Sequence, residues 1–267
     1  MYPTLSDSEF DCFRRFILNA AGIHMSAAKK QLVAGRLGKR LKARGLSSFG
    51  AYYEVLQCGQ DRQEVQTAVD LLTTNETYFF REPRHFQLLR QLAQDAAAAS
   101  RPLTVWSAAS STGEEAYSIA MVLADLMPSL PWSVMGSDIS QRVLDRARTG
   151  HYDLQRARQT PPEYLRRFCL RGHGEQEGTL LVRRELRQRV QFQQINLNEP
   201  LPSLGSFDLV FLRNVMIYFN GDTKRQVVQR VTSALASGGH LCIGHSESIS
   251  DLATGLTLLA PSIYRKP

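Results

Sequence analysis

VWSAASSTGEE, residues 105–115, joins the end of an apolar run to a turn of small residues and the start of a helical pattern. Only small side chains occupy positions 107–113, so the backbone there can approach a ligand closely at the carboxyl end of a strand. The segment is not a GxGxxG fingerprint, because Gly113 is its only glycine, and a tight turn without a ligand fits it equally well. It predicts a strand, a turn and a helix, the repeating unit of a parallel α/β sheet.

The sequence on both sides of this segment repeats the alternation. Expected strands cover residues 103–109, 132–138, 190–196, 207–214 and 241–246, with an extended pair at 256–265. Expected helices cover residues 114–126, 140–149 and 222–237, the last ending at Gly238-Gly239. We therefore predict an α/β fold with a doubly wound, mostly parallel sheet. Residues 164–188 interrupt the alternation and predict a small inserted antiparallel hairpin, although an ordinary surface excursion fits them too.

The first hundred residues read as helical. Ser6 and Glu9 have the spacing of a capping box, and further helices are expected over 26–44, 48–57, 61–73 and after Pro83. Residues 1–50 contain nine Lys or Arg and three acids, so most of the net charge of +7 lies there. This excess predicts an acidic partner on an N-terminal surface. Arg36, Arg40 and Arg44 repeat along one helix face, which a solvated surface would also explain.

Composition narrows the class of protein. With 43% hydrophobic and 21% charged residues, the chain is typical of globular proteins. It has no uncharged apolar run of about 18 residues, so we expect no transmembrane helix. The four cysteines and six histidines show no metal-ligand spacing, which predicts reduced cysteines, a cytoplasmic location and no metal.

Asp138 ends the second predicted strand, 25 residues after Gly113. An acidic side chain at that place can accept hydrogen bonds from both ribose hydroxyls of an adenosine, although a polar strand end or helix cap would look alike. Polar or pocket-facing positions follow two later strands: Asn196, Leu197, Arg213, Asn214 and Tyr218. Together these positions predict a shared pocket for an adenosine-containing ligand, either a dinucleotide or S-adenosylmethionine.

Five runs carry a more specific resemblance. They are NETYFFREPRHF (75–86), VWSAASSTGEEAYSIA (105–120), GSDIS (136–140), FLRNVMIYF (211–219) and GHSES (244–248). In this order they resemble the chemotaxis receptor methyltransferase (CheR) family over essentially the whole chain. The resemblance implies a helical domain at 1–85, an S-adenosylmethionine-binding domain at 86–267 and a small β-subdomain inserted at about 164–190. It also implies methylation of glutamate side chains on cytoplasmic chemoreceptor domains, for adaptation in chemotaxis.

The resemblance assigns roles position by position. Cofactor-binding positions are Asn75, Thr77, Arg81, Glu114, Asp138, Asn196, Leu197, Arg213 and Asn214, and active-site positions are Arg81 and Tyr218. The face formed by Arg36, Arg40 and Arg44 is complementary to an acidic receptor helix. The loop containing Gly172 and Gly174 resembles the type that docks a receptor's C-terminal peptide. No metal, no nucleic acid and no membrane insertion are expected, and the chain is expected to be a monomer.

A glutamate carboxylate, with a pKa near 4.3, is already an ionised nucleophile at pH 7. The enzyme therefore needs no general base and has to supply placement and a partly dry site. Arg81 is the expected positioning residue, unless it forms a structural ion pair with Glu82 or Glu76. Two other functions stay open at this point, a nucleic-acid methyltransferase and a non-catalytic receptor-binding module. Residues 213–216 lack the Asn/Asp-Pro-Pro-aromatic loop of base methylation, and the basic face lacks interleaved aromatics.

Overall fold

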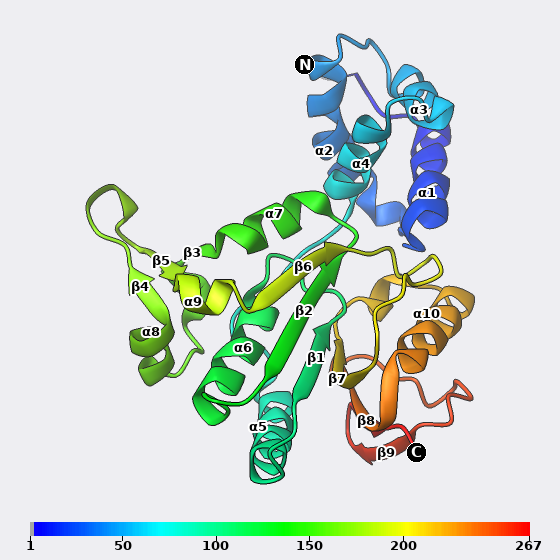
Figure 1. Ribbon diagram of the computed structural model, residues 1–267. Helices are drawn as coiled ribbons and strands as arrows, with labels where there is room; N and C mark the ends of the chain where they lie inside the picture. The colour runs from blue at the N-terminus through cyan, green and yellow to red at the C-terminus, as the bar shows by residue number, and fades with distance from the viewer. Residues whose placement is uncertain (1–2) are drawn as a thin grey trace.

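The computed structural model describes residues 3–267 and begins with a domain of four helices (Figure 1). These are α1 (Asp7–Ala21), α2 (Lys30–Ala43), α3 (Phe49–Cys58) and α4 (Arg62–Leu72). The predicted capping box starts α1, because the Ser6 hydroxyl accepts from Glu9 N at 3.2 Å and Glu9 Oε2 accepts from Ser6 N at 2.9 Å. Apolar side chains from all four helices form a separate core around Phe13 and Leu37. The helix expected from residue 26 starts as a 3₁₀ turn (Ala27–Lys29) before α2.

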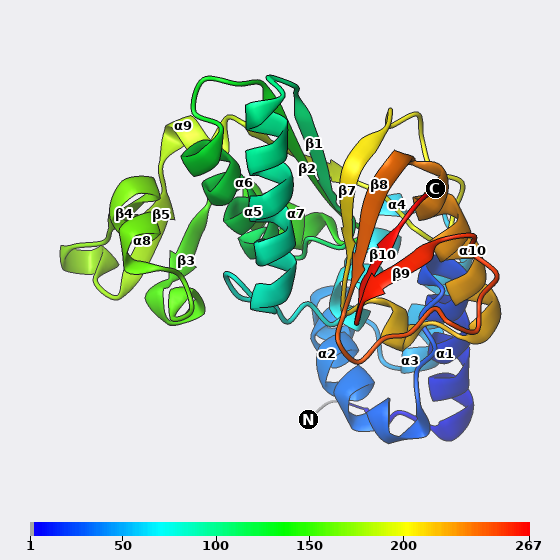
Figure 2. The same cartoon turned by 90° about the horizontal axis from the view of Figure 1, so that it is seen from below.

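A seven-stranded sheet forms the rest of the core (Figure 2). Its order is β6-β2-β1-β7-β8-β10-β9. The strands are β1 (Leu103–Ser107), β2 (Trp132–Asp138), β6 (Val190–Gln194), β7 (Phe207–Leu212), β8 (Leu235–Ile243), β9 (Thr257–Ala260) and β10 (Ile263–Arg265). The first five run parallel, whereas β10 pairs antiparallel with β8 and β9.

Helices cover both faces of this sheet. One face packs against α5 (Pro83–Ala98) and α6 (Glu114–Leu126), and the other against α10 (Gly221–Ser233). Between β2 and β6, α7 (Gln141–Thr149) contacts both strands and also α4. The predicted doubly wound, mostly parallel fold with an N-terminal helical domain is therefore confirmed. No helix in the described part of the chain is long and apolar enough to span a bilayer.

A three-stranded antiparallel sheet projects from the side of the main sheet (Figure 1). It has the order β3-β5-β4, with β3 (His151–Asp153), β4 (Cys169–Arg171) and β5 (Thr179–Val182). Two short helices, α8 (Pro162–Phe168) and α9 (Arg184–Arg187), flank these strands. The predicted hairpin is the β4–β5 pair. The sequence missed β3, because three residues are too few to show an alternating pattern.

Two neighbouring predicted boundaries are wrong, since the strand expected over 241–246 is β8, which begins at Leu235 and ends at Ile243. The helix expected over 222–237 ends at Ser233, and Gly238-Gly239 lie inside β8 instead of closing the helix. A Cβ on Gly239 would lie 2.9 Å from the carbonyl oxygen of Ala236 and 3.1 Å from that of Phe207. Only glycine allows this close approach between backbones, so the pair serves strand packing and not a helix stop.

Candidate functional site

A cavity of about 420 Å³ lies between the N-terminal helices and the carboxyl ends of the parallel strands. The N-terminal side contributes residues 21–32 (in part) and 72–77, and the sheet contributes side chains from 108–115, 138–139, 195–197 and 213–219. This edge is where an open α/β sheet binds its ligands. Most of the predicted cofactor positions line it: Asn75, Thr77, Arg81, Asp138, Asn196, Leu197, Arg213 and Asn214, together with Tyr218.

The turn after β1 forms one wall of the cavity. Ser111 has φ +50°, an unusual conformation for a residue other than glycine, and its N–H donates to Asp138 Oδ2 at 3.0 Å. Its hydroxyl donates to the Asn75 carbonyl oxygen at 2.9 Å. The turn therefore connects the second strand to the segment that leads out of the helical domain. Small side chains are needed here because the backbone itself forms the wall.

Asp138 is buried at the end of β2. Its two oxygens each accept one backbone N–H, from Ser111 to Oδ2 and from Ser140 to Oδ1, both at 3.0 Å. Burial raises the pKa of Asp138 to about 6. Each carboxylate oxygen can accept a second hydrogen bond, so Asp138 can still receive two hydroxyl donors from the cavity.

Arg213 is buried at the back of the cavity and connects three segments. Its Nη1 donates to Glu115 Oε2 at 2.7 Å, and its Nη2 donates to the Arg81 carbonyl oxygen at 2.6 Å. The same Nη2 lies 3.2 Å from Glu82 Oε2. Burial raises the pKa of Glu115, although Arg213 and the Ser107 hydroxyl favour its ionised form. Arg213 therefore fixes the backbone of Arg81 and the orientation of Glu115.

Glu114 and Glu115 differ sharply in position. Glu114, expected to face the cofactor, is fully buried against Arg156 and the Thr112 hydroxyl and does not line the cavity. Glu115 lines the cavity instead. Adjacent residues of a helix point about 100° apart, since a turn contains 3.6 residues. The sequence could not choose between neighbouring glutamates, because each is a plausible first-turn acid.

The segment leading out of the helical domain is held by backbone hydrogen bonds. Phe80 and Glu82 have φ of +56° and +60°. Phe80 N donates to the Ser118 hydroxyl at 3.0 Å, and Phe79 N donates to the Arg156 carbonyl oxygen at 3.1 Å. Non-glycine residues with positive φ persist only where surrounding contacts impose them, and they concentrate at functional sites.

Arg81 points into the cavity from this segment. Its guanidinium donates to the Glu76 carbonyl oxygen at 3.1 Å and lies over the Tyr78 ring, 5.7 Å from the centroid. Among the described residues, no carboxylate lies within ion-pairing distance of it, so the ion pair with Glu82 or Glu76 considered as an alternative is not formed. The remaining N–H groups of Arg81 are available to a ligand.

Tyr218 also lines the cavity, within a 3₁₀ turn (Met216–Tyr218). Burial raises its pKa, so its phenol is protonated at neutral pH. Its carbonyl oxygen accepts from His24 N at 2.7 Å, and Ile23 pairs with Phe219 in a β-bridge. The N-terminal domain thus contacts the segment that carries this tyrosine.

The Asn196 amide is already engaged. It donates to the Ala20 carbonyl oxygen at 2.7 Å and to Glu199 at 2.9 Å, while Leu197 contributes a buried apolar side chain. Asn196 therefore joins the sheet to the end of α1 as well as lining the cavity. This second contact could not be read from the sequence, because 176 residues separate the two groups.

The predicted substrate residues lie outside the cavity. Arg36 donates to the carbonyl oxygens of Leu71 and Thr73, both at 2.9 Å. Arg40 binds Glu64 with two nitrogens, at 2.9 and 2.5 Å, and Arg44 lies 2.8 Å from Asp61. These guanidinium groups therefore hold α2 against α4, and a role in receptor binding stays a prediction. The exposed cations of α2 are Lys39 and Lys42, followed by Arg44 at its C-terminal end.

Replacing Arg40 with alanine is expected to lower the free energy of unfolding by roughly 3 kcal/mol. Glu64 is only 3% exposed and would lose its bidentate partner, keeping the Tyr52 hydroxyl at 2.7 Å and the more distant Arg44 guanidinium at 3.8 Å. Chemical denaturation measures this effect, with Lys42→Ala as the control on the exposed face of the same helix. Equal stability of the two variants would show that the pair contributes little.

Gly172 and Gly174 lie in the loop between β4 and β5, away from the cavity. A Cβ on Gly172 would lie 2.0 Å from the Gln176 carbonyl oxygen, and Gly174 has φ +59°. Both glycines are therefore required by the loop itself. Whether the loop binds a peptide is a separate matter, and that role stays a prediction.

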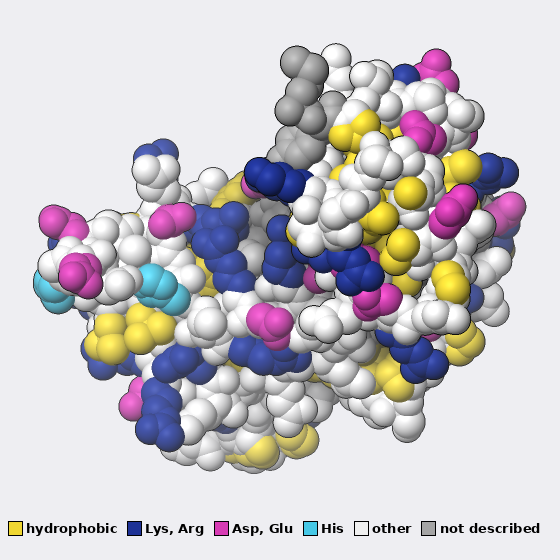
Figure 3. All heavy atoms as spheres, turned by 90° about the horizontal axis from the view of Figure 1, so that it is seen from above, with side chains coloured by type: hydrophobic (Ala, Val, Ile, Leu, Met, Phe, Trp, Pro, Cys, Tyr) yellow, Lys and Arg dark blue, Asp and Glu magenta, His cyan; other side chains and the backbone are white. Residues whose placement is uncertain are grey.

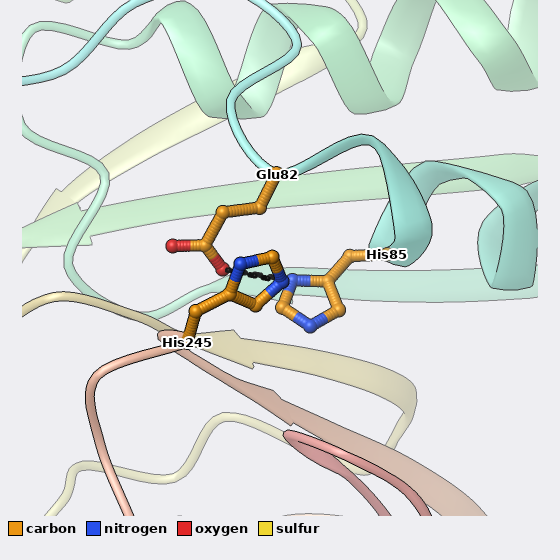
Figure 4. Close-up of side chains that lie close together, drawn as sticks. All are labelled: Glu82, His85 and His245. Carbon is orange, nitrogen blue, oxygen red and sulfur yellow. Dashed lines mark ion pairs between the residues drawn. The ribbon is translucent and has the colours of Figure 1, made fainter.

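Glu82, His85 and His245 point toward one another beside the cavity (Figure 4). Glu82 Oε2 lies 3.5 Å from His85 Nδ1 and 3.7 Å from His245 Nε2. The spacing could suit a metal, but the Arg213 guanidinium lies 3.2 Å from the same oxygen and already supplies a positive charge. Burial, with Arg213 nearby, lowers the pKa of His85 to about 3, so this histidine is neutral at pH 7. We assign no metal here, and its expected absence stays a prediction.

Comparison with known proteins gives consistent matches. Residues 8–73 match the model "CheR methyltransferase, all-alpha domain", and residues 75–262 match "CheR methyltransferase, SAM binding domain". The chain is 42% identical to a chemotaxis protein methyltransferase of Escherichia coli, covering 97% of this chain and 91% of that protein. It is 41% identical to that of Salmonella typhimurium (97% and 90%) and 44% identical to chemotaxis protein methyltransferase 2 of Pseudomonas aeruginosa (96% and 92%).

Proposed function

The chain belongs to the CheR methyltransferase family, and from that premise we propose that it methylates glutamate side chains of chemoreceptors, using S-adenosylmethionine. The observation that carries the proposal is the shared cavity, in which Arg81, Asp138 and Tyr218 converge. The product would be a glutamate γ-methyl ester, with S-adenosylhomocysteine as the second product. We also propose that the protein acts in the cytoplasm, as a monomer.

The cavity fits the cofactor by its donors and acceptors. Asp138 keeps two free acceptor sites for the ribose hydroxyls. Glu115 lines the cavity, as do Asn75, Thr77 and Asn214, and we propose that it receives the cationic methionine end. When bound, S-adenosylmethionine supplies an electrophilic methyl group on a sulfonium.

The protein's own residues place the incoming glutamate. Arg81 is free of ion pairs and offers planar donors to a carboxylate. Because tight bidentate pairing would also stabilise the nucleophile, we assign Arg81 to positioning. Tyr218, protonated at neutral pH, can donate one hydrogen bond or form the wall of the pocket. No general base is required, since the nucleophile is already ionised.

The direct test is transfer of labelled methyl groups to purified receptor cytoplasmic domains, with RNA and DNA as parallel substrates. We expect base-labile label on the receptor, as an ester requires. Stable label on nucleic acid would instead support the rival methyltransferase function. Cofactor binding without any transfer would support the non-catalytic binding module.

Receptor docking is proposed to use the exposed lysines of α2. The side chains of Lys39 and Lys42 are exposed and have no hydrogen-bond or ion-pair partner among the described residues, so their charges are available to an acidic helix. We expect Lys39→Glu with Lys42→Glu to raise the receptor KM about tenfold and to leave kcat little changed. Steady-state kinetics at two salt concentrations measure this, and the difference should shrink at high salt.

The control for these lysines is Lys224→Glu with Arg225→Glu on α10, which reverses the same number of charges elsewhere. Unlike Lys39 and Lys42, these two side chains are paired, with Asp251 at 3.6 Å and Asp222 at 2.9 Å, so thermal unfolding of both double variants is measured alongside the kinetics. An equal rise in KM for both pairs would show a general charge effect and no docking site.

The protein has a second basic surface. Figure 3 shows Lys and Arg side chains gathered around the recess between the N-terminal helices and the subdomain. Helix α7 carries three exposed arginines, Arg142, Arg146 and Arg148.

The subdomain loop with Gly172 and Gly174 is proposed to bind a receptor's C-terminal peptide. Its support is the resemblance and the position of the loop, which projects from the main body (Figure 1). Methylation of receptor domains with and without their C-terminal tails tests this role. Tail-independent methylation would leave the loop without a docking function.

A further inference from the structure

Glu247 lies in the GHSES run after β8, and its carboxylate accepts four backbone N–H groups. Oε2 accepts from Gly244 N at 2.7 Å and from Asn214 N at 2.9 Å. Oε1 accepts from Met216 N at 2.7 Å and more weakly from Ile217 N at 3.3 Å. Hydrogen bonds to an ionised carboxylate are among the stronger ones in proteins. One side chain therefore holds the backbone of the neighbouring strand's exit loop.

The loop that Glu247 holds includes one residue in the left-handed region of backbone conformation. Asn214 has φ +57°, and its own backbone N–H is one of the four groups that donate to the Glu247 carboxylate. The packing is tight at this point: a Cβ on Gly244 would lie 2.6 Å from Asn214 Nδ2 and 2.8 Å from Glu247 Oε2. Gly244 is thus needed for the carboxylate to reach the loop.

The same loop forms a wall of the cavity. Asn214, Ile217 and Tyr218 all line it, and the Tyr218 carbonyl oxygen accepts from His24 of the helical domain. Glu247 does not line the cavity, and each of its oxygens already accepts two hydrogen bonds. It is therefore not available as a base or as a substrate contact.

We infer that Glu247 is a positioning residue for methyl transfer, which holds segment 214–218 so that Asn214 and Tyr218 face the cofactor and the substrate. This inference rests on the proposed function for its effect on turnover. Its effect on cofactor binding follows from the cavity alone.

The test is Glu247→Gln, which keeps the size of the side chain but replaces one acceptor oxygen with a donor nitrogen. We expect kcat to fall at least tenfold and the Kd for S-adenosylhomocysteine, measured by calorimetry, to rise at least tenfold. Glu247→Ala should lose more than Glu247→Gln in both measurements. All assays are run below the onset of thermal unfolding.

The matched control is Glu9→Gln. Glu9 also accepts backbone N–H groups, from Ser6 at 2.9 Å and Gly50 at 2.7 Å, but it lies in the helical domain away from the cavity. It should lose stability and keep both kcat and S-adenosylhomocysteine affinity. If Glu247→Gln behaves like Glu9→Gln, Glu247 is only structural and the inference is overturned.

Gly244→Ala provides a second route, because it pushes the loop and the carboxylate apart without removing the charge. We expect the same loss of affinity, and unchanged affinity in a folded Gly244→Ala protein would contradict the inference. The two proposals fail separately. If the unaltered protein binds S-adenosylhomocysteine but methylates no receptor, the proposed function fails while the affinity measurements still decide the role of Glu247.

Discussion

Replacing Arg81 with alanine is expected to reduce kcat for methyl transfer roughly 100- to 1,000-fold, because orientation of the reacting carboxylate is lost. The guanidinium lies at the cavity with no carboxylate partner among the described residues, so its removal leaves no buried charge unpaired. Folding should be nearly unaffected. Single-turnover transfer of labelled methyl groups to a receptor domain measures the chemical step directly.

Two comparisons make the Arg81 result interpretable. Arg81→Lys keeps the charge and loses the planar pair of donors, so we expect it to recover only part of the rate. Arg84→Ala, three residues on and exposed, is the matched control. Turnover of Arg81→Ala near that of Arg84→Ala would remove Arg81 from the active site.

Replacing Asp138 with asparagine is expected to weaken S-adenosylhomocysteine binding roughly 100-fold, since a buried hydrogen bond to a charged acceptor contributes about 1.5–3 kcal/mol. The amide keeps the size of the side chain but places a donor against the N–H of Ser111 or Ser140. Isothermal titration calorimetry gives the affinity, and thermal unfolding without ligand shows whether the fold persists.

The pH dependence provides an independent check on Asp138. Burial raises its pKa to about 6, so the unaltered protein should lose affinity as the pH falls through 6 and the carboxylate gains a proton. Protonation of Asp138 has the opposite effect on folding stability. Because the pKa of Asp138 is higher in the folded than in the unfolded protein, gaining a proton favours the folded state, so unfolding caused by this group does not explain the loss of affinity. Asp138→Asn should show a flat profile over this range. A parallel decline in both proteins would place the titrating group elsewhere.

The sequence predicted the parallel strands well, because each combines an apolar run with a turn of small or polar residues. Helix α6 and strand β2 have the predicted bounds. The errors lie where local pattern and tertiary packing differ. Gly238-Gly239 look like a helix stop, but Gly238 is needed for its φ of +76° and Gly239 for its close approach to Phe207 of another strand.

The same limit applies to the site. Residues at strand ends could be placed because parallel strands bring their carboxyl ends to one edge. The sequence analysis chose Glu114 and missed Glu115, because both lie in the first turn of the same helix. They differ in their partners, since Glu114 pairs with Arg156 and Glu115 pairs with Arg213. The ion pair of Arg40 with Glu64 could not be predicted either, because a repeat of basic residues has the same sequence pattern whether it faces solvent or a buried glutamate.

The cavity has walls from both the helical domain and the sheet, joined by contacts such as Asn196 with Ala20 and His24 with Tyr218. A molecule held there acts as a crosslink between two units that have separate hydrophobic cores. A ligand that contacts both units stabilises their association as well as the fold of each unit, so cofactor binding is expected to raise the unfolding temperature of the whole protein.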